Sequence, residues 1–342
     1  MVGRAALPQT DVAASPQTAH SRAVWFWAAI GVLVLVVQSS VWVRFLIAGP
    51  HELVRFREVG SAGWIWAKIF EGSLCVILVV TVGLTVRGAL RARRVTTNAM
   101  LLIGFASMLW LDPMLNYLRP GFYFSTNLVN VESWVRFIPG QVAPFSELTP
   151  VPYLWVGATY LGFHLPVVLL NVAVMRRVAA RHPSARLPVL MVPAFAVSLV
   201  TDLGLEGFAL RTGTFAYPAA VHDWSLWGGK TYQFPLVEML AAPLFWVTVA
   251  ALKYVGDRDG VLPVHRGVER VDRYAGVMRV LAVIGVVNVV FLLLPLGLPQ
   301  LGVILSDPFP EGYPPVLSGG WCGDHGEPYG PCPAPGVPWR TR

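Results

Sequence analysis

Seven long apolar stretches constrain what this chain can fold into. A helix that crosses a bilayer needs about 20 mostly apolar residues. The chain is 55% hydrophobic and 13% charged, with a mean hydropathy of +0.58. The sequence therefore predicts an all-α integral membrane protein, a bundle of about seven transmembrane helices. The predicted spans lie near residues 23–48, 62–86, 96–118, 151–175, 187–210, 233–254 and 276–305.

The flanks of this membrane domain, which we place at residues 23–305, differ from it in composition. Residues 1–22 mix Ala, Pro, Ser, Thr and Gln, which predicts a short disordered cytoplasmic tail. The first apolar stretch is longer than the apolar core of a signal peptide and lacks a small-x-small cleavage pattern, so we expect it to be retained. Residues 306–342 are rich in Pro and Gly, which predicts an outward-facing tail without a helix. Pro295 and Pro299 are expected to end the last helix early.

The distribution of Lys and Arg predicts the orientation. With a cytoplasmic N-terminus, 16 basic residues fall on the inner side and 9 on the outer side. Inner loops of membrane proteins are enriched in Lys and Arg, so we predict a multi-pass protein of the cell membrane with its N-terminus inside and its C-terminus outside. The net charge of +7 then reflects loops that face anionic lipid, and it does not indicate nucleic-acid binding.

The cysteines of the tail allow two interpretations. Cys322 and Cys332 would face an oxidising exterior, where a disulfide or two free thiols are both compatible with their spacing. Together with Asp324 and His325 they could form a metal site, but the spacing matches no standard zinc pattern. We predict no metal.

Six ionisable residues interrupt the apolar stretches. A charge at the centre of a bilayer costs about 2.5–3.5 kcal/mol on insertion scales, so such residues normally face the interior of a bundle. In the predicted orientation all six lie towards the same membrane face. We therefore expect a polar cavity between helices. The residues are Lys68, Glu71, Asp112, Asp202, Glu206 and Glu238.

Each of these residues also has a purely structural interpretation. Lys68 and Glu71 are three residues apart, which favours an ion pair within one helix. Asp112 precedes Pro113 and could cap or kink a helix. Asp202 and Glu206, four residues apart, share a helix face and could mark its outer end.

Glu238 lies between Pro235 and Pro243, where it could satisfy broken backbone, and His164 could be a core histidine or a site residue. The charge balance argues against purely structural roles for all of these residues. The spans hold five carboxylates and one lysine, so the carboxylates cannot all be neutralised by pairing within the spans. Carboxyl groups crowded into an apolar cavity cannot all ionise, which leaves a proton to donate at neutral pH. The cluster thus indicates general acid–base chemistry.

Two connections are unusually aromatic. Residues 119–150 include Tyr123, Trp134 and Phe137, and the connection after residue 210 includes Trp224 and Trp227. We expect both to cover the cavity as lids, although an interfacial aromatic belt would have the same composition. No phosphate-binding loop, dinucleotide fingerprint, serine-hydrolase elbow or zinc-protease motif is present, and no internal repeat of the transporter kind is visible.

Four segments of the chain are distinctive: Trp110-Leu-Asp-Pro-Met-Leu-Asn116-Tyr, Thr201-Asp-Leu-Gly-Leu-Glu206-Gly, Thr231-Tyr-Gln-Phe-Pro-Leu-Val-Glu238, and Phe309-Pro-Glu-Gly-Tyr313 followed by Cys322. These segments resemble a known family, the AveC-like spirocyclases of avermectin- and milbemycin-type macrolide pathways. The resemblance spans roughly residues 60 to 323.

The resemblance implies a membrane enzyme that closes a dihydroxy-ketone in a hydrophobic polyketide macrolactone into a spiroketal. Some members also dehydrate the new ring, and both outcomes are compatible with these residues. Such chemistry needs an acid and a base but no cofactor. We expect Asp112, Glu206 and Glu238 to share the catalytic roles. The expected substrate-binding residues are Asn116, Asp202, Trp110, Tyr117, Tyr232 and His164.

Two other functions stay open at this point. A proton-coupled transporter or exporter of a hydrophobic metabolite would also carry acids within its spans, and a noncatalytic scaffold would use them as structural pairs. The lack of repeats and the one-sided placement of the acids favour the enzyme. The oligomeric state and the side of substrate entry do not follow from the sequence.

Overall fold

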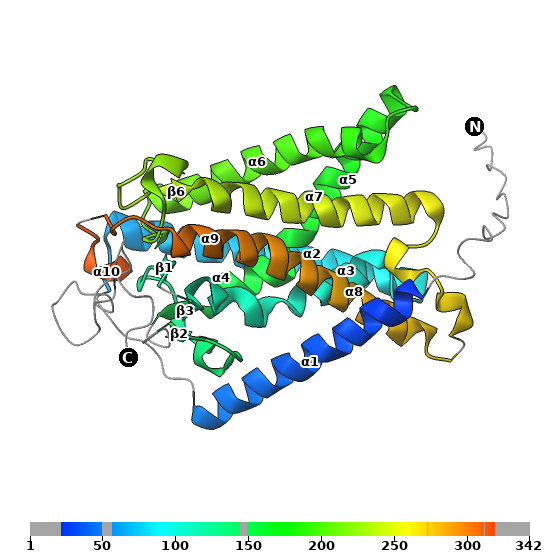
Figure 1. Cartoon of the computed structure of the whole chain (residues 1–342), viewed down its shortest axis with the longest axis horizontal. Coiled ribbons are helices and arrows are strands. Elements are labelled where there is room, and N and C mark those ends of the chain that lie inside the picture. The colour runs from blue at the N-terminus through cyan, green and yellow to red at the C-terminus, as the bar shows by residue number, and fades with distance from the viewer. Residues whose placement is uncertain are drawn as a thin grey trace.

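A computed structural model describes residues 22–49, 57–118, 120–143, 149–271, 273–310 and 312–318. The predicted N-terminal tail up to residue 21 and the Cys322–Cys332 pair lie outside these residues. Helices make up most of what is described, and short two-stranded sheets connect them at one end of the bundle (Figure 1).

Six helices are long and apolar enough to cross a membrane, and a bent pair makes a seventh. The prediction of an all-α bundle of about seven spans is confirmed. The bent pair comprises α3 (Thr97–Ala106) and the 3₁₀ helix η1 (Leu109–Asn116), which meet at 40°. The others are α1 (Ala23–Ala48), α2 (Ala62–Ala92), α4 to α5 (Tyr153–Arg181), α6 (Leu187–Arg211), α7 (Leu236–Asp259) and α8 to α9 (Ala275–Ile304).

Two of these spans contain a π-helical segment. Between α4 (Tyr153–Ala158) and α5 (His164–Arg181) lies η4 (Thr159–Phe163). The last span comprises α8 (Ala275–Phe291), η8 (Leu292–Gly297) and α9 (Leu298–Ile304). The expectation that Pro295 and Pro299 end this helix early is wrong, because the π turn at Pro295 absorbs the missing hydrogen bond and the helix continues.

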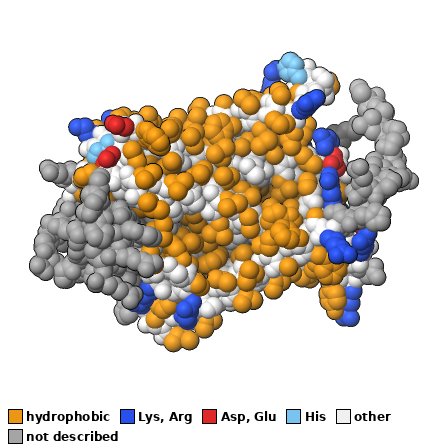
Figure 2. Space-filling view, in the orientation of Figure 1, with side chains coloured by type: hydrophobic (Ala, Val, Ile, Leu, Met, Phe, Trp, Pro, Cys, Tyr) orange, Lys and Arg blue, Asp and Glu red, His pale blue; other side chains and the backbone are white. Residues whose placement is uncertain are grey.

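The face of the bundle drawn in Figure 2 is apolar across its middle section. Figure 2 shows hydrophobic side chains across that section, with charged side chains gathered at the two ends. On α1 and α2, for example, Leu33 and Val79 are 62% and 70% exposed. A helix that exposes such residues needs lipid rather than water around it. The protein is therefore a multi-pass membrane protein.

Small and polar residues hold the helices together. At the crossing of α1 and α8, a Cβ on Gly31 would lie 2.1 Å from the Leu281 carbonyl oxygen, so only glycine permits this approach. Asn288 of α8 donates to Ser107 Oγ at 2.8 Å beside α3, where both side chains are buried. Such contacts replace the hydrophobic effect, which does not drive helix association within lipid.

Short strands tie the connections into a cover over one end of the bundle. Strand β1 (Tyr123–Phe124) pairs with β4 (Phe215–Ala216), so the two aromatic connections of the sequence meet. Strand β2 (Asn130–Glu132) pairs with β3 (Pro150–Pro152), and β5 (Ser225–Leu226) with β6 (Phe234–Pro235). The remaining short helices are η2 (Val135–Phe137), η5 (His222–Trp224), η6 (Pro263–His265), η7 (Val268–Arg270) and α10 (Pro315–Ser318).

The tail after residue 305 differs from its prediction, because it contains the four-residue helix α10. The backbone N–H of Thr126 donates to the carbonyl oxygen of Val316 at 2.7 Å. This contact joins the tail to the cover, and it gives the short helix the tertiary support that its length alone does not provide.

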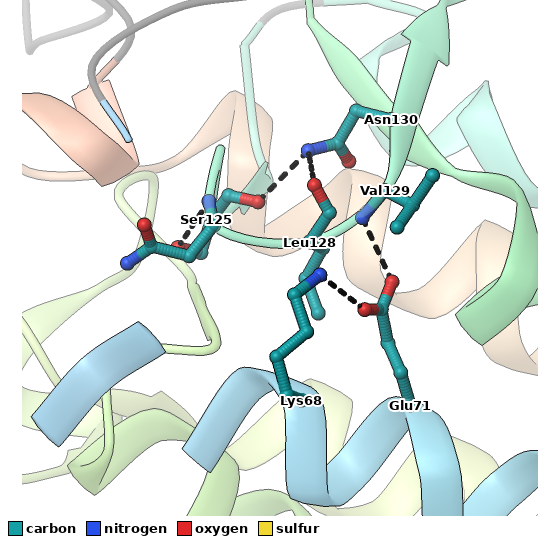
Figure 3. Close-up of polar contacts among 7 residues, drawn as sticks. Lys68, Glu71, Ser125, Leu128, Val129 and Asn130 are labelled. Carbon is teal, nitrogen blue, oxygen red and sulfur yellow. Dashed lines mark hydrogen bonds and ion pairs between the residues drawn. The ribbon is translucent and has the colours of Figure 1, made fainter. Parts of the chain in front are cut away.

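The ion pair expected within α2 is present and anchors the cover. Lys68 Nζ lies 2.7 Å from Glu71 Oε2, and Glu71 Oε1 accepts a hydrogen bond from Val129 N at 2.8 Å (Figure 3). Glu71 is buried, so its charge is neutralised by Lys68 and its second oxygen fixes the connection before β2. These two residues are structural, and neither lines the pocket described next.

Candidate active site

Four carboxylic acids line one pocket beneath the cover. Asp112 comes from η1, Asp202 and Glu206 from α6, and Glu238 from the first turn of α7. Three separate segments of the chain thus bring acids together, as the sequence predicted. The space open to water-sized molecules inside the pocket is about 130 Å³. This is below the roughly 300–1,000 Å³ of pockets that enclose a drug-sized ligand, so the pocket can hold part of a large ligand.

Three of the acids form one group. Asp202 lies close enough to Glu206 and Glu238 for their charges to interact, and both of its carboxyl oxygens are buried without a hydrogen-bond partner among the described residues. Glu206 Oε2 accepts a hydrogen bond from Tyr217 Oη at 2.9 Å. Burial and the neighbouring acids raise the pKa of Tyr217 well above its ordinary value. The phenol therefore keeps its proton and remains a donor.

Asp112 forms a second acidic centre. Its Oδ1 accepts a hydrogen bond from Tyr160 Oη at 3.3 Å, and Tyr160 lies in the π segment η4. The bend between α3 and η1, followed by Pro113, turns Asp112 into the pocket. Both acidic centres thus pair a carboxyl group with a buried tyrosine.

His164 is a basic side chain of the pocket lining, and its hydrogen bonding fixes one tautomer. Its Nδ1 accepts from Trp246 Nε1 at 2.9 Å, so a neutral imidazole carries its proton on Nε2. That Nε2 is buried and has no partner among the described residues. The histidine therefore combines both interpretations of the sequence, because one nitrogen is satisfied in the core and the other is left for a ligand.

No Lys or Arg is found among the described residues that line the pocket. Four carboxyl groups in a setting without a fixed cation cannot all carry charge, since each buried charge increases the cost of the next. Some of them must be protonated at neutral pH. The pocket therefore has both proton donors and proton acceptors.

Aromatic rings make up much of the remaining wall. They come from both aromatic connections and from three spans, so both connections contribute to the wall of the pocket. Phe122 and Tyr217, from the two connections, lie with ring centroids 5.0 Å apart. The faces of such rings attract cations. The aromatic lining residues are Phe122, Phe124, Trp155, Tyr160, Phe163, Phe215, Tyr217, Phe245, Trp246 and Phe291.

The helices depart from regular α geometry where they border the pocket. The 3₁₀ helix η1 contributes Asp112, the π segment η4 contributes Tyr160 and Phe163, and the π segment η8 contributes Pro295. Such distortions are uncommon and concentrate at functional sites. Here they turn side chains from three spans towards one point.

Four residues expected to bind substrate lie outside the lining. Asn116 is buried and bonds the backbone of Gly121 and Phe122, which shapes the turn before β1. The Tyr117 hydroxyl donates to the Pro139 carbonyl, and Trp110 accepts at its carbonyl from Trp134 Nε1.

The ring of Tyr232 lies 4.4 Å below the guanidinium of Arg211. Asn116, Tyr117 and Trp110 thus support the cover, and Tyr232 supports the end of α6. Conversely, sequence reasoning missed Tyr160, Tyr217 and Trp246. Tyr160 precedes His164 by four residues, a spacing that could have indicated it. Among the described residues, no three of the types that bind metals are arranged to hold an ion.

An apolar groove lies beside the pocket between α2 and α6. Leu205 lines both the groove and the pocket, and Phe70 of the groove packs against Trp155 of the pocket with ring centroids 5.2 Å apart. The space in the groove open to water-sized molecules is about 430 Å³. Its wall includes Ile69 and Val200, which are 49% and 71% exposed. The groove therefore faces the lipid.

The fold and the pocket define a class: a polytopic helical membrane protein with an acidic, aromatic-walled pocket under a cover of connections. A family model described as Spirocyclase AveC-like matches residues 92–318, which is more than half of the 342 residues. The chain belongs to the AveC-like spirocyclase family. The matched region runs from the end of α2 to α10 and contains all four acids of the pocket. Searches of the curated proteins and of the solved structures gave no match.

Proposed function

We propose that this protein is a membrane spirocyclase that converts a dihydroxy-ketone of a hydrophobic polyketide macrolide into a spiroketal in the acidic pocket. One observation supports it most: acids from η1, α6 and α7 meet in an aromatic-walled pocket that has no Lys or Arg among its described lining residues. Family membership supports spiroketal formation as the reaction. The reaction joins one ketone and two hydroxyl groups and releases one water, so it needs no oxidant or reductant.

The first step forms a hemiketal. One substrate hydroxyl adds to the ketone carbon, its proton passes to a carboxylate, and the ketone oxygen receives a proton and becomes a hydroxyl. A donor that polarises the ketone would accelerate this addition. The Nε2–H of His164 is such a donor, because Trp246 occupies the other nitrogen and Nε2 has no partner among the described residues.

The second step breaks the new C–OH bond. A carboxylic acid protonates the hemiketal hydroxyl, water leaves, and an oxocarbenium cation forms. The second substrate hydroxyl then attacks the cationic carbon and gives its proton to a carboxylate. Return of that proton from the base to the group that acted as acid restores the catalyst. The aromatic wall and the remaining carboxylate stabilise the cation. A cover over the pocket would also limit the access of bulk water, which would otherwise compete with the second hydroxyl.

The two acidic centres suggest a division of roles. Asp202, Glu206 and Glu238 lie within reach of one another's charges, so at least one of them keeps a proton and is the acid. Asp112 belongs to the other centre, where Tyr160 supports its charge, and is the base that takes the proton of the attacking hydroxyl. The positions of both centres around one substrate would fix which face of the cation is attacked.

The groove between α2 and α6 suggests where the rest of the substrate lies. The pocket can hold the reacting segment but not a whole macrolactone. The groove is apolar, shares Leu205 with the pocket and faces lipid. We place the apolar body of the substrate there, which lets a hydrophobic intermediate enter sideways from the bilayer.

Purified protein in lipid nanodiscs, incubated with an open dihydroxy-ketone macrolide, tests the proposal. The expected result is a single spiroketal stereoisomer without any ion gradient, formed faster than in nanodiscs alone. Product of the same isomer ratio as in acid, at the rate of empty nanodiscs, would overturn it. Accumulation of unchanged substrate in proton-loaded vesicles would instead indicate a transporter.

A further inference from the structure

The opposite end of the bundle contains a second polar cavity that the proposed reaction does not use. It lies where α2 ends, α3 begins, α7 ends and α8 begins, and the space in it open to water-sized molecules is about 500 Å³. Basic side chains gather at this end of the molecule (Figure 2). By the bias of Lys and Arg along the chain, this end faces the cytoplasm.

The charges of the cavity do not balance. Arg94, Lys253 and Arg279 line it with one acid, Asp257. Asp257 is already engaged, because its oxygens lie 2.7 Å from Arg176 Nη2 and 3.0 Å from Lys253 Nζ. No acid of the described residues pairs with the side chains of Arg94 and Arg279. Two guanidinium groups thus flank the cavity, and neither is paired with an acid of the described residues.

Other features of the cavity also favour an anion. Lys253 is 8% exposed and shares the single carboxylate of Asp257 with Arg176, so these two cations have one acid between them. The first turn of α3 opens into the cavity at Thr97 and Asn98, whose backbone N–H groups have no acceptor within the helix. A helix start of this kind adds partial positive charge.

The wall is half apolar, which distinguishes this cavity from a simple ion site. Val95, Met100, Val261 and Leu262 line it beside the basic residues. The cavity is also open at Gly276, where an added Cβ would meet nothing within 4 Å. An occupant with a charged head and an apolar part would contact both kinds of wall.

We propose that this cavity binds a phosphate ester through Arg94, Arg279 and the start of α3. Guanidinium groups bind phosphate oxygens with paired, charge-assisted hydrogen bonds. The phosphate ester comes from the headgroup of an anionic phospholipid of the inner leaflet or from a soluble phosphate compound. Basic pockets between helices on the cytoplasmic side suit such headgroups. The proposal does not depend on the spirocyclase reaction.

Native mass spectrometry of the full-length protein tests this inference. Wild-type protein is released from nanodiscs of phosphatidylcholine with a minor fraction of phosphatidylglycerol, and retained lipid is compared with Arg94→Gln, Arg279→Gln and the double variant. We expect retained phosphatidylglycerol to bind about fivefold more weakly for each arginine removed. Arg87→Gln and Arg91→Gln, in the last turns of α2 and outside the cavity lining, are matched controls and should retain it.

A second variant separates the cavity from general surface charge. Gly276→Phe leaves every charge in place but fills the open space, and it should abolish retention as the double arginine variant does. Inorganic phosphate and glycerol 3-phosphate, added as competitors, distinguish the two sources: displacement of the lipid indicates a site that accepts soluble phosphates, and resistance indicates a headgroup site. Equal retention by wild type, Gly276→Phe and the double variant would overturn the proposal.

Discussion

The acids of the pocket and the acids of the basic end differ in their partners. At the basic end, Asp257 contacts Arg176 and Lys253, and Asp259 contacts Arg258 and Arg266. In the pocket, by contrast, Asp202 has neither a cation nor a hydrogen-bond partner among the described residues. The chain thus supplies a Lys or Arg to neutralise a carboxylate where that acid has only a structural role. Acids left unpaired within an apolar bundle indicate chemistry.

Removing the acids of the pocket should produce the largest effect. Glu206→Gln, Glu238→Gln and Asp112→Asn keep the shape of each side chain but remove its ability to exchange a proton. We expect each to lower the rate of stereocontrolled cyclisation about 100-fold or more, as for lost general acid–base groups. Product is measured by chiral chromatography with protein in nanodiscs.

The control for this comparison is Asp259→Asn, the same chemical change in an ion pair at the basic end. It should leave the rate per folded molecule unchanged. Full activity in all three pocket variants would remove the assignment of these acids, whatever the thermal stability of the proteins.

His164 should have the next largest effect. His164→Phe removes the Nε2–H that is proposed to hold the ketone oxygen, and we expect kcat to fall about tenfold or more, in line with a lost donor to developing charge. His164→Gln keeps an N–H donor and should retain more activity. Trp246→Phe leaves the imidazole but frees its tautomer, so its loss should be smaller. Equal kcat for His164→Phe and wild type would exclude the role.

The groove allows a test that depends on the size of the substrate. Gly204 lines it, and an added Cβ there would meet nothing within 4 Å. Gly204→Trp should therefore fill the groove and raise KM about tenfold for the full macrolide, with little change for a short keto-diol that fits the pocket alone. Gly83→Trp, at an equally open position of α2 outside the groove, is the control. A similar effect on both substrates would contradict this placement of the macrolide body.

The paired acid of α2 should affect stability rather than chemistry. Glu71→Gln removes the charge that faces Lys68 and weakens the acceptor for Val129 N. Loss of a buried charged hydrogen bond costs about 1–3 kcal/mol, so Tm should fall while kcat per folded molecule is kept. Lys68→Met, which removes the other partner of the ion pair, is the companion variant. Loss of kcat without loss of Tm in Glu71→Gln would instead place this acid in the reaction.

The sequence predicts the spans and the acids well for a physical reason. Lipid requires long apolar helices, so their lengths are visible in the residues themselves. An acid within such a stretch is conspicuous, which is why Asp112, Asp202, Glu206 and Glu238 could be named before the structure. The catalytic roles given to Asp112, Glu206 and Glu238 stay predictions.

The aromatic partners and the bends could not be predicted in the same way. Tyr217 and Trp246 are aromatic residues in a chain where 12% of residues are aromatic, and no spacing separates them from lipid-facing neighbours. The π segments depend on tertiary packing, so no feature of the sequence indicated that the helix would continue through Pro295. Asn116 was expected to bind substrate, but its side chain shapes the turn before β1 instead.

The smallest expected effect concerns pH at the basic end. Burial lowers the pKa of His265 from 6.5 to about 4 in the folded protein, so the unfolded chain binds a proton between these values that the folded chain does not. The contribution of the neutral histidine to the free energy of unfolding is therefore fully present above pH 6.5, and it is lost as the pH falls towards 4. His265→Gln cannot take up this proton. The Tm of wild type should thus fall more than that of His265→Gln between pH 7.5 and about pH 5, measured by scanning fluorimetry, with the exposed His182→Gln as control. Parallel losses in wild type and His265→Gln would show that other groups govern the acid sensitivity of this end.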